Sequence, residues 1–252
     1  MDRNIQKSIV KLDKIQDKLL NKVEKESQLK GKIYEKVPMK LCDTLETAFA
    51  KAFELVFLHG TGVIEKTFDK VVLASEFNKN DYIADIKGNK KSLNGVDKPA
   101  AKSNAANSLI ATFSGLGLGA LGIGVPDIPI FVGTILKGVY QIAVSYGFSY
   151  DTDIEKIYIL RLIRTAVSTG DKKLRYNTQL ENITGQTAQL KEEIAITAKA
   201  LSHAMLVEKF VQGLPIVGVV GGYFNHQVYK KIAKLGVIKY KKRYLRQKLG
   251  EN

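Results

Sequence analysis

The sequence predicts an all-α protein folded as a single compact multi-helix domain, with glycine-rich central helices and a long basic C-terminal helix. Apolar residues recur at intervals of three and four along most of the 252 residues, which is the period of a helix face. Residues that start and stop helices separate these segments. No alternation of apolar and polar residues of comparable length predicts a strand. The chain is also long enough for one domain with a full core.

Residues 1–36 are predicted to form an amphipathic N-terminal helix ahead of a larger helical domain at residues 37–252. Charges are spread over residues 1–22, so this stretch lacks the apolar core of a secretory signal. The single cysteine, Cys42, cannot form an internal disulfide. Both observations favour the cytoplasm. The apolar face of the first helix is predicted to comprise Ile5, Ile9, Leu12, Ile15, Leu19 and Val23.

Two helices and a polar connection are expected before residue 103. The first, over residues 38–58, opens with a proline, which suits the first turn of a helix, and a His-Gly pair follows its end. The second is expected over residues 61–77. Residues 78–102 are rich in Lys, Asn, Asp and Gly, and they are interpreted as a polar loop.

Residues 103–150 contain only two charged residues, Asp127 and Lys137. Within them, residues 108–125 form an uncharged run close to the roughly 20 residues that a membrane-spanning helix needs. Five glycines dilute this run, and each glycine inside a helix costs about 1 kcal/mol relative to alanine. Two interpretations follow: a buried core helix whose glycines permit close packing, or a segment that enters the bilayer.

Helix start signals follow this low-charge region. Asp127 is predicted to cap a helix over residues 128–146, because an aspartate side chain accepts hydrogen bonds from the first free N–H groups of a helix. The Asp-Thr-Asp sequence at residues 151–153 predicts the start of the next helix. On that helix, Arg161 and Arg164 are expected to face solvent or an acidic partner.

The last third of the chain is predicted to hold two long helices. Apolar residues spaced by three and four over residues 180–201 indicate one helical segment. A Gly-Leu-Pro sequence at residues 213–215 interrupts the chain, and a final helix is expected over residues 216–248.

The formal net charge of +14 predicts an anionic partner. Much of the excess lies between Glu208 and Glu251, where no acidic residue occurs. We expect these cations to meet acidic lipid headgroups on one side of the final helix. The predicted lipid-binding residues are Lys230, Lys231, Lys234, Lys239, Lys241, Lys242, Arg243 and Arg246.

Nucleic acid is the rival anionic partner. Tyr240 and Tyr244 lie among the cations, where they could stack on bases. Tyrosines also favour membrane interfaces, and the basic segment directly follows an uncharged, glycine-rich stretch at residues 210–225. Membrane contact accounts for both features, so an anionic membrane surface is the predicted partner and nucleic acid is not expected.

No motif predicts a catalytic residue, a metal or a cofactor. The G-x-G-x-x-G spacing at residues 117–122 lacks the preceding strand and the later acidic residue of a dinucleotide site. His59, His203 and His226 are far apart in the sequence and form no metal-binding pair. If the fold gathers acid-base groups into an enzyme site, the candidates are Asp127, Asp151, Asp153 and His203.

Four short motifs stand in order along the chain: GVPDIPIF at 124–131, LPIVG at 214–218, Gly-Gly-x-x-Asn at 221–225 and Lys-Arg-Tyr-Leu at 242–245. In this order they resemble the EcsC protein family, over most of the chain from about residue 38 to residue 246. The resemblance implies a helical, membrane-associated protein without an established biochemical activity. The polar residues within the motifs are Asp127, Asn225 and Arg243, which either form a polar site or cap and pack helices.

The expected function is that of a peripheral membrane protein, which binds anionic lipid at the inner face of the cell membrane. The family is mostly bacterial and named from a member encoded beside an ABC transporter, so the resemblance adds lipid handling or an accessory role at a membrane transporter. Two alternatives remain open. One is a hydrolase-like enzyme acting on lipid or peptide, and the other is a soluble helical scaffold that binds a protein partner or RNA.

Overall fold

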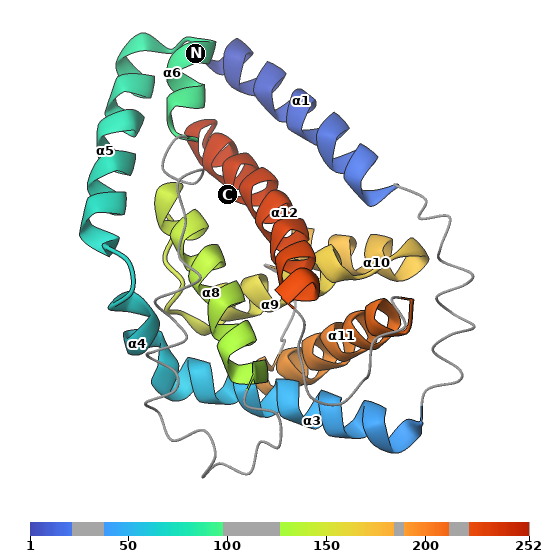
Figure 1. Cartoon of the computed structure of the whole chain (residues 1–252). Helices are drawn as coiled ribbons and strands as arrows, with labels where there is room; N and C mark the ends of the chain where they lie inside the picture. Colours follow the sequence, from blue (N-terminus) through green and yellow to red (C-terminus); the bar gives the residue numbers. More distant parts are fainter. Residues whose placement is uncertain (22–37, 98–126, 184–188, 212–221, 252) are drawn as a thin grey trace.

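Every regular element within the described residues is a helix, which confirms the predicted all-α class (Figure 1). The computed structural model describes residues 1–21, 38–97, 127–183, 189–211 and 222–251. A π-helical turn, Val56–Gly60, joins α3 to α4. The α-helices are α1 (Asp2–Leu20), α3 (Met39–Leu55), α4 (Thr61–Glu65), α5 (Lys70–Lys87), α6 (Lys90–Gly95), α8 (Asp127–Ser145), α9 (Asp153–Val167), α10 (Gly170–Glu181), α11 (Leu190–Val211) and α12 (Gly222–Lys248).

The last helix, α12, occupies the middle of the fold (Figure 1). It packs on α8 and α9, and α1 also lies along it. Around this centre, α3 contacts α8 and α11, α5 contacts α8, and α10 and α11 contact α9. One hydrophobic cluster extends from Ile5 in α1 to Leu245 in α12. These helices therefore share a single core, which confirms the predicted single domain.

Helix α8 is apolar because neighbouring helices cover it on several sides. The stretch Ile128–Ser145 is long and apolar enough to span a membrane, but 89% of it is buried inside the protein, as in the core helix of many globular proteins. Its one charged side chain, Lys137, is buried and donates a hydrogen bond from Nζ to the Thr67 carbonyl oxygen at 2.9 Å. Burial lowers the pKa of Lys137.

The predicted helix over residues 61–77 is wrong, and so is the predicted polar loop over residues 78–97, whereas its residues 98–102 lie outside the described part of the structure. The structure has a short α4, a break, and then α5 and α6. Asp69 caps α5 by accepting a hydrogen bond from the Val72 N–H at 2.9 Å, and Asn89 caps α6 in the same way. The polar residues interpreted as a loop are thus the caps and exposed faces of two helices.

The Asp-Thr-Asp start signal is confirmed, with Thr152 as the residue that caps α9 by accepting from the Glu155 N–H at 3.2 Å. Of the two expectations for Arg161 and Arg164, exposure to solvent is wrong, and an acidic partner is found within the protein. Both side chains are buried, and both form ion pairs with Glu193 of α11. The single helical segment predicted over residues 180–201 is also wrong, because α10 ends at Glu181 and α11 begins at Leu190.

Some predicted features fall outside the described residues. They include the glycine-rich run at residues 108–125 and the start of the predicted final helix, which is described only from residue 222. Helix α8 begins at Asp127, one residue earlier than predicted. The side chains of Asp127 and Asn225 lie outside the described part of the structure, so the capping role of Asp127 remains a prediction.

Candidate anion-binding site

The central position of α12 separates its cations into an exposed group and an internal group. Lys230, Lys231, Lys234 and Arg246 are exposed. In contrast, the residue surfaces of Lys239, Lys241 and Lys242 are only 3%, 7% and 4% exposed. A helix that packs on several neighbours must turn some of its polar residues inward, and buried ammonium groups then need carboxylate partners.

Two of the internal lysines converge on Glu181 at the end of α10. Nζ of Lys239 lies 2.6 Å from Glu181 Oε1, and Nζ of Lys242 lies 3.5 Å from the same oxygen. Lys242 also pairs with Asp13 of α1 at 2.6 Å. Burial lowers the pKa of Lys239 to about 8. Burial alone would raise the pKa of Glu181, but the hydrogen bond from Lys239 and the two ammonium charges lower it to about 2.

The third internal lysine, Lys241, points from α12 toward α6. Its Nζ lies 2.6 Å from Asp97 Oδ2 and 3.0 Å from Asn94 Oδ1. Asp97 also accepts a hydrogen bond from the Tyr146 hydroxyl at 2.9 Å. Each oxygen of the Asp97 carboxylate therefore has a partner within the protein.

Arg243 fixes α12 to the start of α9. Its two terminal nitrogens donate to the two carboxylate oxygens of Glu155, at 2.6 and 2.9 Å. The guanidinium also lies 4.2 Å from the ring centres of both Phe148 and Tyr158. Burial alone would lower the pKa of Arg243, but the hydrogen bonds to Glu155 raise it above its ordinary value. These contacts fit the packing interpretation of this motif residue.

The predicted lipid-binding set therefore needs correction. Lys239, Lys241 and Lys242 are buried and Arg243 is partly buried, and all four form ion pairs with carboxylates of the same chain, so they are not the exposed cations that the sequence predicted. The physical reason is that α12 packs on α1, α8, α9 and α11, so several of its polar side chains face other helices. Lys230, Lys231, Lys234 and Arg246 remain as exposed cations.

Three of these exposed cations line a pocket between α1, the α9–α10 junction and α12, with a volume of about 420 Å³. Five lysines and no acidic residue line it, which makes its field strongly positive. The apolar part of its lining comes from Ile15, Leu19 and Ala166. We call this site the lysine pocket; its lysines are Lys18, Lys173, Lys230, Lys231 and Lys234.

Local structure positions two lysines that sequence reasoning missed. Lys173, in the first turn of α10, donates a hydrogen bond from Nζ to the Leu19 carbonyl oxygen at 3.0 Å, near the end of α1. That carbonyl is one of the last in α1, where a cation also interacts favourably with the helix dipole. Lys18 comes from the exposed side of the same helix end. The sequence contains no signal that either residue would join cations more than 50 positions away.

Of the acid-base groups considered for an enzyme, Asp151 and Asp153 are not brought together with His203, and the side chain of Asp127 lies outside the described part of the structure. Asp151 and Asp153 lie at the start of α9, and Asp151 contacts Lys70 at 3.5 Å. His203 lies on α11, where burial and the charge of Lys172 lower its pKa. Lys172 follows the other end of α9, and a helix of 15 residues is about 22 Å long. Within the described ranges, no three His, Cys, Asp or Glu residues could hold a metal ion.

The chain is similar to one protein family and to two proteins of Bacillus subtilis. The EcsC protein family matches residues 3–245. "Protein EcsC" from Bacillus subtilis (strain 168) is 25% identical over 210 residues, which cover 83% of this chain and 80% of that protein. "Uncharacterized protein YdbA" from the same organism is 26% identical over 160 residues, covering 60% of this chain and 56% of the relative. No solved structure matches.

The family match also revises the extent of the resemblance. It begins at residue 3, so it includes all but the first residue of α1, whereas the motifs suggested a start near residue 38. This extent fits the packing of α1 along α12.

Proposed function

The chain belongs to the EcsC protein family, and on that premise we propose that it is a peripheral membrane protein whose lysine pocket binds anionic lipid headgroups. The carrying observation is that five lysines and no acidic residue surround one open, partly apolar pocket. Each basic side chain held near an anionic leaflet contributes about 1 kcal/mol to membrane binding. Five such side chains on one face are enough for salt-sensitive attachment to a membrane.

The shape and chemistry of the lysine pocket support a lipid ligand. Phosphate and carboxylate groups of acidic lipids offer the negative charge that its rim lacks. The lining from Ile15, Leu19 and Ala166 offers apolar surface to the glycerol and upper acyl region of a lipid. In this proposal the protein acts at the cytoplasmic face of the cell membrane, where an accessory role at a transporter would also bring it.

One observation weighs against the nucleic-acid alternative. Tyr240 and Tyr244, the aromatic residues that were candidates for base stacking, are buried at 0% and 2% exposure. Their hydroxyls donate to Glu155 and Asp81 inside the protein. Stacking on bases requires an accessible ring face, so these residues do not supply it.

The proposal predicts that the location of the lysines, and not only their charge, determines membrane binding. Replacing Lys18, Lys230, Lys231 and Lys234 by glutamine should weaken binding to vesicles containing phosphatidylserine at least tenfold, because about 1 kcal/mol per lysine is removed. Co-sedimentation at low and high salt measures the partition coefficient. Neutral vesicles should bind the unaltered protein far more weakly than anionic ones.

A matched control separates a specific site from general attraction. Lys14, Lys40, Lys79 and Lys191 are exposed and line none of the pocket, so their replacement by glutamine removes the same charge elsewhere. Vesicle binding by this control should fall much less. An equal loss in both variants would contradict a localised lipid site. No binding of the unaltered protein to either vesicle would favour the soluble scaffold.

A further inference from the structure

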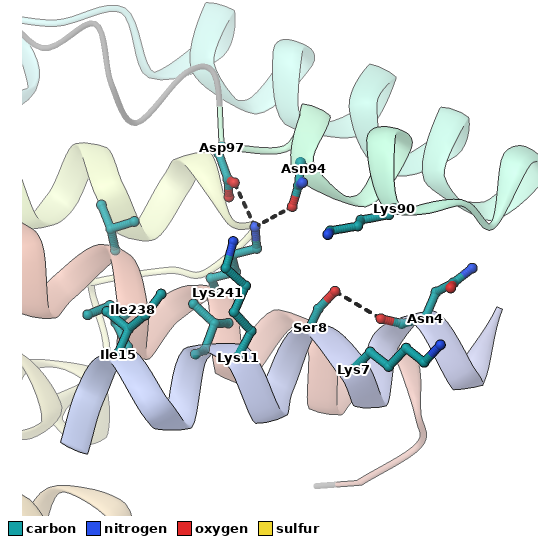
Figure 2. Close-up of a pocket in the computed structure, with 12 residues that line it drawn as sticks. Asn4, Lys7, Ser8, Lys11, Ile15, Lys90, Asn94, Asp97, Ile238 and Lys241 are labelled. Atoms are coloured by element: carbon teal, nitrogen blue, oxygen red, sulfur yellow. Dashed lines mark hydrogen bonds and ion pairs between the residues drawn. The ribbon is translucent and has the colours of Figure 1, made fainter. Parts of the chain in front are cut away.

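A second pocket lies between α1, α6 and α12, nearer the start of α1 than the lysine pocket. Figure 2 shows the residues that line it. Its volume is about 440 Å³, within the range of small-molecule sites in proteins. Ile15 lines both pockets, because α1 rests on α12 along that position. We call this second cavity the α6 pocket.

The rim of the α6 pocket carries positive charge that no carboxylate in the described part of the chain neutralises. Lys7 and Lys11 of α1 and Lys90 of α6 are exposed at this rim, and none forms an ion pair with a carboxylate among the described residues. Figure 2 shows Lys11 and Lys90 extending over the gap from opposite helices. The one acidic residue of the lining, Asp97, is already engaged by Lys241.

The interior of the α6 pocket is divided into a polar end and an apolar end. Ile15 and Ile238 lie together at one end, with Lys11 and Lys241 beside them, and Ser8, Lys7 and Lys90 lie toward the other (Figure 2). This division follows from α1 itself, whose residues 4–8 are polar where they line the pocket and whose residues 12 and 15 are apolar. A single molecule that fills the pocket would therefore need an anionic head and a short apolar tail.

We infer that the α6 pocket binds one phosphate monoester that carries a short alkyl or acyl tail. The dianionic phosphate meets Lys7, Lys11 and Lys90, and the tail packs on Ile15 and Ile238. Phosphate is favoured over a carboxylate because it offers three oxygens and close to two negative charges to three separate ammonium groups. This inference does not rest on the membrane proposal, because it uses other lysines and a ligand free in solution.

Isothermal titration of the full chain with hexyl phosphate, without vesicles, tests the inference. We expect saturable binding at one site, at least tenfold tighter than binding of inorganic phosphate, because only the ester reaches the apolar end. Replacing Lys7, Lys11 and Lys90 by glutamine should weaken it at least tenfold. Replacing the exposed lysines 14, 79 and 191 removes the same charge and should leave the affinity within twofold.

A second variant blocks the pocket without changing its charge. Ser8 is half-buried in the wall, so Ser8→Tyr should fill the cavity and abolish hexyl phosphate binding while the thermal unfolding temperature shows that the fold persists. Unchanged affinity in S8Y, no saturable binding, or inorganic phosphate binding as tightly as the ester would each overturn the inference.

Competition identifies the source of the ligand and keeps the two proposals separate. Displacement of hexyl phosphate by soluble dihexanoyl phosphatidic acid and by vesicles containing phosphatidic acid would support the site with a lipid headgroup as ligand. Displacement by soluble phosphate esters alone would support it with a free metabolite. The Lys18, Lys230, Lys231 and Lys234 variant should lose vesicle binding and keep hexyl phosphate binding, so failure of one proposal leaves the other intact.

Discussion

Arg243 shows why residue type and residue role must be separated in this chain. In the sequence it stands among eight cations of a basic segment, and nothing nearby distinguishes it from Lys241 or Arg246. In the fold it binds both oxygens of Glu155, which lies 88 positions earlier. Only guanidinium matches a carboxylate in this two-bonded way while stacking on two rings. The Lys-Arg-Tyr-Leu motif thus contains a residue that links α12 to the start of α9.

Glu181 is the residue whose protonation should matter most for stability in acid. Its pKa in the folded protein is about 2, compared with 4.5 ordinarily. A lowered carboxyl pKa stabilises the fold above pH 4.5, and this contribution is lost as the pH falls toward 2. Because 35% of the side chain is exposed, we expect a loss of about 1–2 kcal/mol after allowing for solvent screening.

The measurement is urea denaturation at pH 7 and pH 3, followed by helical ellipticity. In Glu181→Gln, the difference in unfolding free energy between the two pH values should be smaller by about 1–2 kcal/mol. Glu192→Gln, which alters an exposed carboxylate on α11, serves as the control and should keep the difference. If the E181Q variant kept the full acid sensitivity of the unaltered protein, the proposed role of the ion pair between Glu181 and Lys239 would be wrong.

At the scale of elements, apolar spacing and start signals predicted the buried helices well. The predicted starts near residues 38, 128 and 153 lie within one residue of α3, α8 and α9. The prediction was wrong over residues 61–97 because Asp and Asn favour both loops and helix caps. Asp69 and Asn89 are helix caps here. Whether such a residue caps a helix or lies in a loop depends on the conformation of the backbone that follows it.

The end of α8 is an element whose geometry requires glycine. Gly147 has a φ of +80°, and a β-carbon there would lie 2.5 Å from ring atoms of Phe77 on α5. Gly147→Ala should therefore lower the unfolding free energy by about 2–3 kcal/mol, because it adds both backbone strain and overpacking. Thermal or urea denaturation measures the change.

Gly62 in α4 is the matched control for this substitution. It is exposed, and a β-carbon added there meets no atom within 4 Å. Gly62→Ala should stabilise the protein by about 0.5–1 kcal/mol through better helix propensity. If G147A were as stable as G62A, the close approach of α5 to the end of α8 would be wrong.

At the scale of the molecule, the net charge of +14 was visible in the sequence, but its distribution was not. The internal cations pair with residues far away in the sequence: Glu181 lies 58 positions from Lys239, and Asp97 lies 144 positions from Lys241. No local pattern encodes such distances. For the same reason only part of the lysine pocket was predicted. Its three cations on α12 are neighbours in the sequence, whereas Lys18 and Lys173 join them only in the folded chain.

The docking of α1 on α12 should depend on the pair between Asp13 and Lys242. Removing the carboxylate in Asp13→Ala leaves a buried ammonium with weaker partners. We expect the amide hydrogens of α1 to exchange about tenfold faster, which corresponds to about 1.4 kcal/mol, while those of α8 are unchanged. Hydrogen exchange with mass spectrometry resolves the two helices.

Asp17→Ala provides the comparison, because it removes a carboxylate from the exposed side of the same helix. In this variant the amide hydrogens of α1 should exchange at the same rate as in the unaltered protein. Faster exchange throughout the molecule in D13A would mean that α1 belongs to the same cooperative unit as the core, and it would exclude a separately opening helix.

The contact between α1 and α12 also sets an order of events during synthesis on the ribosome. Gln16 and Lys242, which share a hydrogen bond, are separated by 226 residues. At translation rates of about 5–20 residues per second, the interval between the two is roughly 10–45 s. During that interval α6 and α10 can already contact α1, but the surface that α12 contributes is missing. The apolar stripe of α1 is therefore only partly covered until α12 has been made, which makes α1 a segment on which a chaperone would act.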